Sequence, residues 1–409
     1  MTTQEARSDG VLLTGATGFV GMELLARYLE HTDRRVHVLV RGASERAVAA
    51  RVQRTLADLF GAGHPFAERV VAVRGDVTRP SLGLRRGRAR DALAEQIDEV
   101  VHSAASVSFD LDLEASRAIN VEGTRRVLEL AERCHARGGL RRFSHISTAY
   151  VAGDHAGCFS EDDLDVGQSF RNSYEQSKFE AEHLVGRWHG RLPLTVLRPS
   201  IVVGARDSGW TASFNVLYWP LRAFARGAYA ALPARRDAPV DVVPVDFVAD
   251  ATFALSQAPE AEGVTFNLVA GRHASSVGEL VALASAFFER PAPRLIQPAL
   301  YRRVMHPVLV RSVRDERRRR ALTRSETFFP YFAMRVAYDD RRARVALRGA
   351  RIAPTPLPTY FDRLVEFAVA ADWGKCQIPR AHALGPLTRP PARRASRGRS
   401  LSSRPALVR

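Results

Sequence analysis

Tyr174 and Lys178 are the residues of this sequence whose types and spacing point most directly to chemistry. They lie four positions apart in the 172–178 segment, and a helix places side chains with this spacing on one face. Only two of the 60 basic residues are lysines, and a compact ammonium fits close to a phenol better than a broad guanidinium does. An ammonium about 4 Å from a phenol would stabilise the phenolate by up to ~4 kcal/mol, or roughly three pKa units. We therefore predict that Lys178 lowers the pKa of Tyr174 and makes its phenol a proton donor or acceptor near neutral pH.

A glycine-rich turn near the N-terminus indicates a nucleotide-binding unit. Residues 11–21 contain an apolar strand and this turn, and a helical pattern follows over 22–29. Gly15 permits a tight turn, Gly18 lets backbone amides approach a pyrophosphate, and Gly21 lets the helix pack close to the strand. The positive end of the helix dipole would then face the phosphates.

The second predicted strand, over 35–41, ends at Arg41. About twenty residues beyond such glycines, NAD enzymes place a carboxylate that binds the ribose hydroxyls. Arginine at this place suits a 2'-phosphate, so the sequence predicts NADPH as the cofactor. The alternative is that Arg41 merely ends a strand in an arginine-rich protein.

Three further predicted strands end in residues suited to the same site. The strand within 70–77 ends at Asp76, which suits an adenine amino group, and the strand within 100–109 ends in small residues. The strand within 143–150 ends in two hydroxyls. Ligands of open α/β sheets bind beyond the carboxyl ends of the strands, so we expect these termini to surround one crevice. His145 precedes the hydroxyls, and we expect it to pack in the strand and not to act as a base.

Several segments together resemble one enzyme superfamily over about residues 10–270, the extended short-chain dehydrogenases/reductases. They are Thr-Gly-Ala-Thr-Gly-Phe-Val-Gly (14–21), Gly-Asp-Val (75–77), His-Ser-Ala-Ala (102–105), Asn-Val-Glu-Gly-Thr (120–124), Tyr174-x-x-x-Lys178 and Arg-Pro-Ser-Ile-Val-Val-Gly (198–204). Three more resemble the branch of fatty acyl-CoA reductases (male-sterility proteins) and thioester reductase domains. These are Ser-Thr-Ala-Tyr-Val (147–151), Asp-Ser-Gly-Trp-Thr (207–211) and Pro-Val-Asp-Phe-Val-Ala-Asp (244–250).

The resemblance implies a role for individual residues. Tyr174 would be the proton donor or acceptor, and Lys178 would hold the nicotinamide ribose. Thr148 would donate a hydrogen bond to the reacting carbonyl, with Ser147 as the alternative, and Asn120 would lie on the flanking helix. The resemblance also implies the cofactor-binding residues. These are Gly15, Ala16, Gly18, Phe19, Val20 and Gly21 in the pyrophosphate turn, Arg41 at the 2'-phosphate, Asp76 and Val77 at the adenine, Ala104 and Ala105 along the cofactor, and Pro199 before the nicotinamide contacts.

The expected fold is α/β: a Rossmann-type doubly wound parallel sheet, a smaller and mostly helical substrate and C-terminal region, and a disordered basic tail. The predicted divisions are a flexible N-terminus (1–9), an NADP-binding Rossmann domain (10–204), substrate-side segments interleaved with the last sheet strands (205–290), a helical C-terminal region (291–375) and a disordered Arg/Pro/Ser tail (376–409). We predict helices over 300–313 and 360–371. The aromatic residues of the 205–240 insertion would suit an apolar acyl channel or a plain core.

The net charge of +16 is concentrated in two places. Residues 373–409 carry nine basic residues and no acidic one, and a second group lies at Arg317–Arg320. The second group is either a solvated helix face or a dock for an acyl carrier protein, coenzyme A phosphates or an anionic membrane surface. Neither suggests nucleic acid, because no zinc finger or recognition helix accompanies them. Three scattered cysteines predict neither disulfides nor a metal site, and we expect a cytoplasmic enzyme that could form a homodimer.

The function predicted from the sequence is NADPH-dependent reduction of an acyl thioester, on coenzyme A or a carrier protein, to an aldehyde or alcohol. One alternative is another enzyme of the extended family, a hydroxysteroid-type dehydrogenase or a nucleotide-sugar epimerase or dehydratase. Arg41 argues against the sugar enzymes, which usually use NAD. A second alternative is a dinucleotide-binding sensor without turnover, which would have no need of Tyr174 and Lys178.

Overall fold

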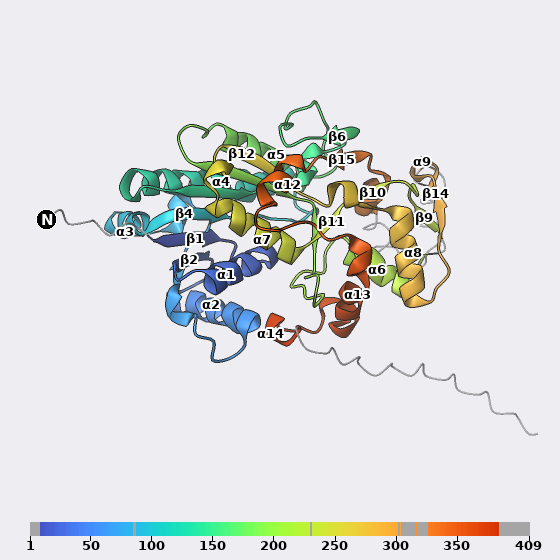
Figure 1. The fold of residues 1–409 in the computed structure, drawn as a ribbon, viewed down its shortest axis with the longest axis horizontal. Coiled ribbons are helices and arrows are strands. Elements are labelled where there is room, and N and C mark those ends of the chain that lie inside the picture. The colour runs from blue at the N-terminus through green and yellow to red at the C-terminus, as the bar shows by residue number, and fades with distance from the viewer. Residues whose placement is uncertain are drawn as a thin grey trace, which may run out of the picture.

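The computed structural model describes residues 9–84, 87–229, 231–301, 303, 316 and 326–383 of the chain. Its centre is a sheet of seven parallel strands (Figure 1). In spatial order they are β12 (Val264–Leu268), β7 (Leu194–Pro199), β5 (Arg142–Ile146), β4 (Ile97–His102), β1 (Gly10–Thr14), β2 (Arg35–Val40) and β3 (Val70–Arg74). Strands β1, β5 and β7 are buried along their whole length, because helices cover both faces of a parallel sheet. The predicted α/β Rossmann-type fold is confirmed.

Two helical layers enclose the sheet (Figure 1). One face packs against α1 (Phe19–His31), α2 (Glu45–Phe60) and α7 (Val245–Gln257), and the other against α3 (Arg88–Gln96), α4 (Leu113–Gly138) and α5 (Ser173–Gly186). The long α4 begins at a capped end, since Asp112 Oδ1 accepts a hydrogen bond from the Ala115 amide at 2.7 Å. It ends before Gly139, whose φ of 72° lies in the left-handed region.

Short elements lie beside the central sheet, many of them packed around a separate apolar cluster. The strands among them pair two by two: β8 (Ile201–Val203) with β11 (Val242–Pro244), β9 (Ala231–Pro233) with β14 (Arg294–Ile296), β10 (Pro239–Val240) with β13 (Ser275–Ser276), and β6 (Gly157–Phe159) with β15 (Val336–Tyr338). The helices are α6 (Tyr218–Ala225), α8 (Val277–Phe288), α9 (Pro298–Leu300), α12 (Arg341–Leu347), α13 (Phe361–Ala370) and α14 (Arg380–Ala383). Helix α13 confirms the helix predicted over 360–371. Most of the helix predicted over 300–313, and the Arg317–Arg320 group, lie outside the described residues.

The prediction of a disordered tail from residue 376 is wrong for residues 376–383. The indole Nε1 of Trp210 donates to the Ile378 carbonyl at 3.1 Å, and Arg380 Nε lies 2.8 Å from Glu23 Oε1 on α1. Ala383 is buried in the core that contains α1 and α2. The composition of the whole tail hid these few apolar contacts and the ion pairs of Arg380 with Glu23 and Glu30. Residues 384–409 lie outside the described part.

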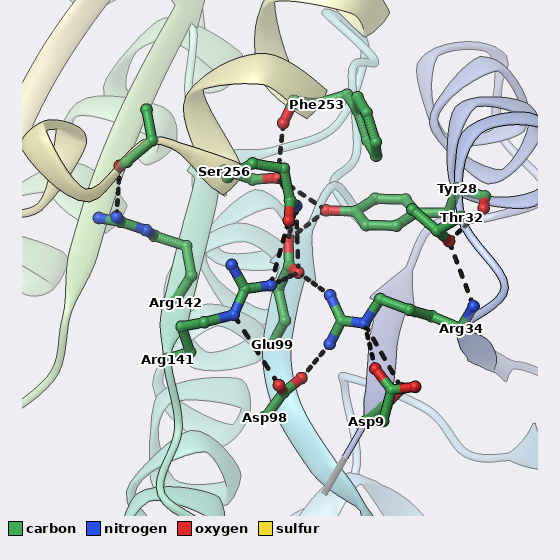
Figure 2. A network of polar contacts seen from close by, with 12 residues as sticks. Asp9, Tyr28, Thr32, Arg34, Asp98, Glu99, Arg141, Arg142, Phe253 and Ser256 are labelled. Atoms are coloured by element: carbon green, nitrogen blue, oxygen red, sulfur yellow. Dashed lines mark hydrogen bonds and ion pairs between the residues drawn. The ribbon is translucent and has the colours of Figure 1, made fainter. Parts of the chain in front are cut away.

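A polar network closes the amino-terminal edge of the sheet (Figure 2). Its centre is the fully buried carboxylate of Glu99 on β4, which accepts hydrogen bonds from Arg34, the phenol of Tyr28 and Arg141, the last at 2.8 Å. Arg34 also pairs with Asp98. Tyr28 projects from α1, whereas Arg34, Glu99 and Arg141 lie at or near the starts of strands, so the network joins elements that are distant in the sequence. No described helix is both long and apolar enough to cross a membrane.

Candidate active site

The turn after β1 has the geometry expected of a pyrophosphate site. Gly15 has a φ of +76°, and a Cβ there would lie 2.7 Å from the Ala104 amide nitrogen. A Cβ on Gly21 would lie 2.0 Å from the Gly15 carbonyl oxygen, so neither position accepts a side chain. Gly18 caps α1 without a side-chain hydrogen bond, which leaves the first amides of the helix for an anion. Ala16 is buried in the core below the turn.

A cavity of about 390 Å³ begins at this turn and runs past the ends of β2, β3 and β4. Its lining includes Gly15, Gly18, Arg41, Val77, Ala104 and Ala105, six of the predicted cofactor residues. Asp76 instead lines an adjoining groove of about 660 Å³, together with Arg41. Asp76 Oδ1 accepts hydrogen bonds from the Thr78 amide at 2.9 Å and the Thr78 hydroxyl at 2.8 Å.

Arg51 also lines the 390 Å³ cavity and was not predicted from the sequence. It projects from α2 and donates to Thr17 Oγ1, in the glycine turn, at 2.8 Å. It lines the same cavity as Arg41, so two guanidinium groups are available to a phosphate there. Its position ten residues after Arg41 was the only signal, and it is a weak one in a chain so rich in arginine.

A second cavity, of about 400 Å³, lies beyond the ends of β1, β4, β5 and β7. It brings together residues from across the sequence prediction: Gly15, Gly18, Phe19, Val20, Gly21, Ala105, Thr148, Tyr174, Lys178 and Pro199. Glycines of the β1 turn and Ala105 line both cavities, which therefore form two parts of one crevice. One part carries the arginines, and the other carries the hydroxyl groups and the lysine.

Helix α5 positions Tyr174 and Lys178. Asn172 caps it by accepting a hydrogen bond from the Glu175 amide at 3.0 Å. The prediction that Lys178 lowers the pKa of Tyr174 is wrong. Burial raises the pKa of Tyr174 to about 12, and a hydrogen bond with Thr148 opposes this rise. Lys178 Nζ donates to the Ile146 carbonyl at 2.7 Å, and burial lowers the pKa of this amine to about 8.

Thr148 is better placed than Ser147 to meet a substrate carbonyl. Its hydroxyl is hydrogen-bonded to the Tyr174 phenol and lies 3.4 Å from the Pro199 carbonyl. The Ser147 hydroxyl donates to Glu182 Oε2 at 2.5 Å, and Glu182 also accepts from Arg198 Nε at 2.9 Å. This buried set holds β5, β7 and α5 together. Glu182 lies one helical turn after Lys178 and was not predicted from the sequence.

Asn120 on α4 connects the helices beside the site. Its Nδ2 donates to Ser177 Oγ on α5 at 2.9 Å, and its Oδ1 accepts from the Ser106 amide at 2.8 Å. His145 packs beneath, fully buried against His102 at 5.5 Å between ring centroids. Burial holds the pKa of both imidazoles well below the usual value, so both are neutral at pH 7. The described residues contain no cluster of three or more His, Cys, Asp or Glu side chains that could hold a metal.

Residues 13–252, more than half of the chain, match the sequence model of the male sterility protein family. The chain belongs to the male sterility protein family. Its relatives include fatty acyl-CoA reductases and reductase domains of peptide synthetases, which are NAD(P)-dependent reductases of the extended short-chain dehydrogenase/reductase type that the sequence predicted. The first turn of α1, which has no side-chain cap, the glycine turn and the arginine-lined cavity fit a nicotinamide dinucleotide cofactor.

Individual relatives of this male sterility family member cover only part of it. Isonitrile lipopeptide synthase of Streptomyces coeruleorubidus is 37% identical over 217 residues, which are 53% of this chain and 14% of that protein. Fatty acyl-CoA reductase wat of Drosophila melanogaster is 27% identical over 286 residues, 61% of this chain and 54% of that protein. The chain thus spans about half of the second relative and a small fraction of the first.

Among solved structures, the terminal R domain from the myxalamid PKS-NRPS biosynthetic pathway is similar over nearly the whole chain. It superimposes with a TM-score of 0.78 at 28% sequence identity and covers 92% of this chain and 93% of its own. Most of the short elements outside the central sheet are therefore part of the shared architecture.

Proposed function

We propose that this enzyme reduces an acyl thioester, carried on coenzyme A or a carrier protein, with NADPH as the reductant. The observation that carries the proposal is the shared crevice, in which Thr148, Tyr174 and Lys178 face one cavity and Arg41 and Arg51 face the other. Membership of a family that includes fatty acyl-CoA reductases and R domains supports a thioester as the substrate.

Arg41 and Arg51 support the choice of NADPH. A 2'-phosphate distinguishes NADPH from NADH, and two guanidinium groups on one cavity can form charge-assisted hydrogen bonds with it. The pyrophosphate would lie over Gly15, Gly18 and the first amides of α1. Lys178, buried beside the catalytic hydroxyls, would bind the nicotinamide ribose.

When bound, NADPH supplies a hydride to the carbonyl carbon. Thr148 and Tyr174 donate hydrogen bonds to the carbonyl oxygen and stabilise its developing negative charge. A pKa of about 12 keeps the Tyr174 phenol protonated at neutral pH, so it holds the proton that the oxygen receives. The resulting hemithioacetal breaks its carbon–sulfur bond to give an aldehyde and a thiol.

Substrate screening tests the proposal. Oxidation of NADPH would be followed with acyl-CoA, acyl carrier protein, aldehyde, ketosteroid and nucleotide-sugar substrates, together with product analysis. We expect thioester-dependent oxidation with stoichiometric release of thiol, and the amounts of aldehyde and alcohol then define the end point. Turnover of a ketosteroid or a nucleotide sugar in the absence of thioester turnover would overturn it.

A further inference from the structure

Two cavities meet on the substrate side of Tyr174. The first is the 400 Å³ cavity that contains Thr148, Tyr174 and Lys178, and the second is a small apolar space of about 40 Å³. Four residues line both: Tyr150, Ile201, Val216 and Tyr331. The remaining walls of the smaller space are Leu217, Pro220, Pro239, Val240, Leu280, Phe332 and Met334. The four shared residues, here called the partition, thus separate the reaction cavity from an uncharged space.

Tyr331 is the most firmly held member of the partition. Its phenol donates to Glu175 Oε1 at 2.7 Å and accepts from Asn172 Nδ2 at 2.6 Å, so it is bound to the first turn of α5 on both sides of Tyr174. Its ring stacks on Phe109, with centroids 5.6 Å apart and planes 10° apart. It also meets Tyr150 edge to face at 5.5 Å. A side chain with this many fixed contacts makes a rigid wall.

Val216 is strained where it faces both cavities. Its φ is +40°, in a region that a β-branched residue adopts only under constraint. It lies just before α6, and the Tyr218 amide donates to the Asn215 carbonyl at 3.0 Å across it. Such strain persists where the surrounding structure imposes it, and it concentrates at ligand sites.

We propose that the partition ends the acyl-binding site, so that this enzyme prefers short acyl groups and Tyr331 and Val216 set the length limit. The proposal rests on the function proposed above and adds the class of acyl group. Ligand pockets for drug-sized molecules span about 300–1,000 Å³. A 400 Å³ cavity that must hold both the nicotinamide end of the cofactor and the acyl group leaves little room for a long chain. The space behind the partition would accept on the order of three water-sized groups.

The test measures the chain-length profile of partition variants. The wild type and Tyr331→Ala, Tyr331→Phe and Val216→Gly would be assayed for kcat/KM with coenzyme A thioesters from butanoyl to hexadecanoyl. We expect the wild type to prefer butanoyl or hexanoyl. Tyr331→Ala and Val216→Gly open the partition, and each methylene that the enlarged space then buries should raise kcat/KM about fourfold. The ratio of dodecanoyl to butanoyl turnover should therefore rise by roughly tenfold or more.

Matched variants separate a size effect from general damage. Tyr331→Phe keeps the ring and removes the bonds to Asn172 and Glu175, so its turnover should fall alike for all chain lengths. Leu280→Phe in the Tyr331→Ala background refills the space behind the partition and should restore the preference for short chains. Val216→Gly is expected to fold even if Tyr331→Ala does not, because glycine adopts a φ of +40° without strain.

A binding measurement keeps this proposal distinguishable from the proposed function. The rise in Tm caused by each thioester without NADPH gives a length profile that does not depend on turnover. A wild type that turns over no thioester would overturn the proposed function, and the binding profile would still decide the role of the partition. Identical length profiles for the wild type, Tyr331→Ala and Val216→Gly in both assays would overturn the proposal that the partition limits the length of the acyl group.

Discussion

The two edges of the central sheet use polar residues in opposite ways. At the amino edge, the buried carboxylate of Glu99 meets Arg34, Arg141 and the Tyr28 phenol, so charges and hydroxyls satisfy one another (Figure 2). At the carboxyl edge, Tyr174 and Lys178 face a cavity, and burial shifts the pKa of both groups. Mutually satisfied groups contribute stability, whereas groups that face a cavity are available to a ligand. We therefore expect that stability and activity can be changed separately.

The largest expected effect is the loss of turnover in Tyr174→Phe. The variant lacks the proton that the carbonyl oxygen receives, and such general-acid roles contribute about 10²–10⁴-fold to the rate. Affinity for NADPH and the Tm should stay close to wild type, because the hydroxyl is directed to the substrate and not to the cofactor. Stopped-flow turnover, cofactor titration and thermal unfolding measure the three quantities. Normal turnover would show that Tyr174 has no role in the reaction and that the carboxyl edge does not act as proposed.

Glu99→Gln should show the reverse pattern. Loss of the carboxylate leaves Arg34 largely buried with Asp98 and the exposed Asp9 as its remaining acidic partners, and breaking such pairs costs about 3 kcal/mol. The matched control is Glu95→Gln, which removes an exposed pair with Arg137 and should change the free energy of unfolding by under about 1 kcal/mol. Denaturant unfolding measures both, and kcat at a permissive temperature should stay unchanged. A fall in kcat comparable to that of Tyr174→Phe would show that the edges are not independent.

Arg41→Asp should change cofactor preference without affecting the amino edge. The substitution removes a charge-assisted contact with the 2'-phosphate, so the Kd for NADPH should rise roughly 10–100-fold while NADH binding is spared or improved. Arg51→Ala should weaken NADPH binding in the same direction, because Arg51 lines the same cavity. The proposed binding of the 2'-phosphate by Arg41 would be wrong if the wild type prefers NADH, or if Arg41→Asp leaves the preference for NADPH over NADH unchanged.

Lys178 should make the stability of the protein depend on pH in a defined window. The folded-state pKa of about 8 lies below the usual value of 10.5, so the unfolded chain binds this proton more tightly. The free-energy cost of burying the charged Lys178 amine is fully present below pH 8 and falls as the amine loses its proton at higher pH. The free energy of unfolding should therefore increase by about 2 kcal/mol between pH 8 and 10. Lys178→Met should remove this part of the slope. Lys375→Met, at an exposed pair with Asp372, is the control and should keep it.

Shortening the C-terminus should have the smallest effect. A chain that ends at Ile378 loses the Arg380 contacts with Glu23 and Glu30 and the burial of Ala383. The cost should be only about 1 kcal/mol, because Arg380 is partly exposed and Glu23 keeps its ion pair with Arg27. A chain that ends at Ala383 keeps all these contacts and should match the full-length Tm. Equal melting temperatures for the two truncations would mean that the contacts of residues 379–383 add no stability.

The sequence predicted the central sheet and most of the crevice because the signals are local. Apolar strands, a glycine turn and a Tyr-x-x-x-Lys spacing each lie within a few residues, and a parallel sheet brings strand ends together by its topology. The predicted pKa effect failed because spacing on a helix does not fix where a side chain points. Lys178 donates to the Ile146 carbonyl, and burial dominates the titration of Tyr174.

Residues that reach the crevice from distant segments were not predictable from local patterns. Tyr331 contacts Glu175 across 156 positions, and nothing around it distinguishes it from the other aromatic residues of the C-terminal half. Glu182 and Arg51 likewise acquire their roles only through tertiary contacts. The boundary of the tail was misplaced because composition averages over many residues. Residues 376–383 are held by a few specific contacts: the ion pairs of Arg380, one indole hydrogen bond and a buried alanine.

The route of the C-terminal segment limits how this chain can be recombined with its relatives. Strand β15 pairs with β6, and the Arg342 amide donates to Glu161 just beyond β6 at 2.7 Å, while Arg380 reaches α1. A crossover between residues 204 and 205 would give β6 and β15 different parents. Chimaeras of this chain and a relative should therefore fold and exchange substrate specificity only when residues 157–162 and 326–383 come from the same parent protein.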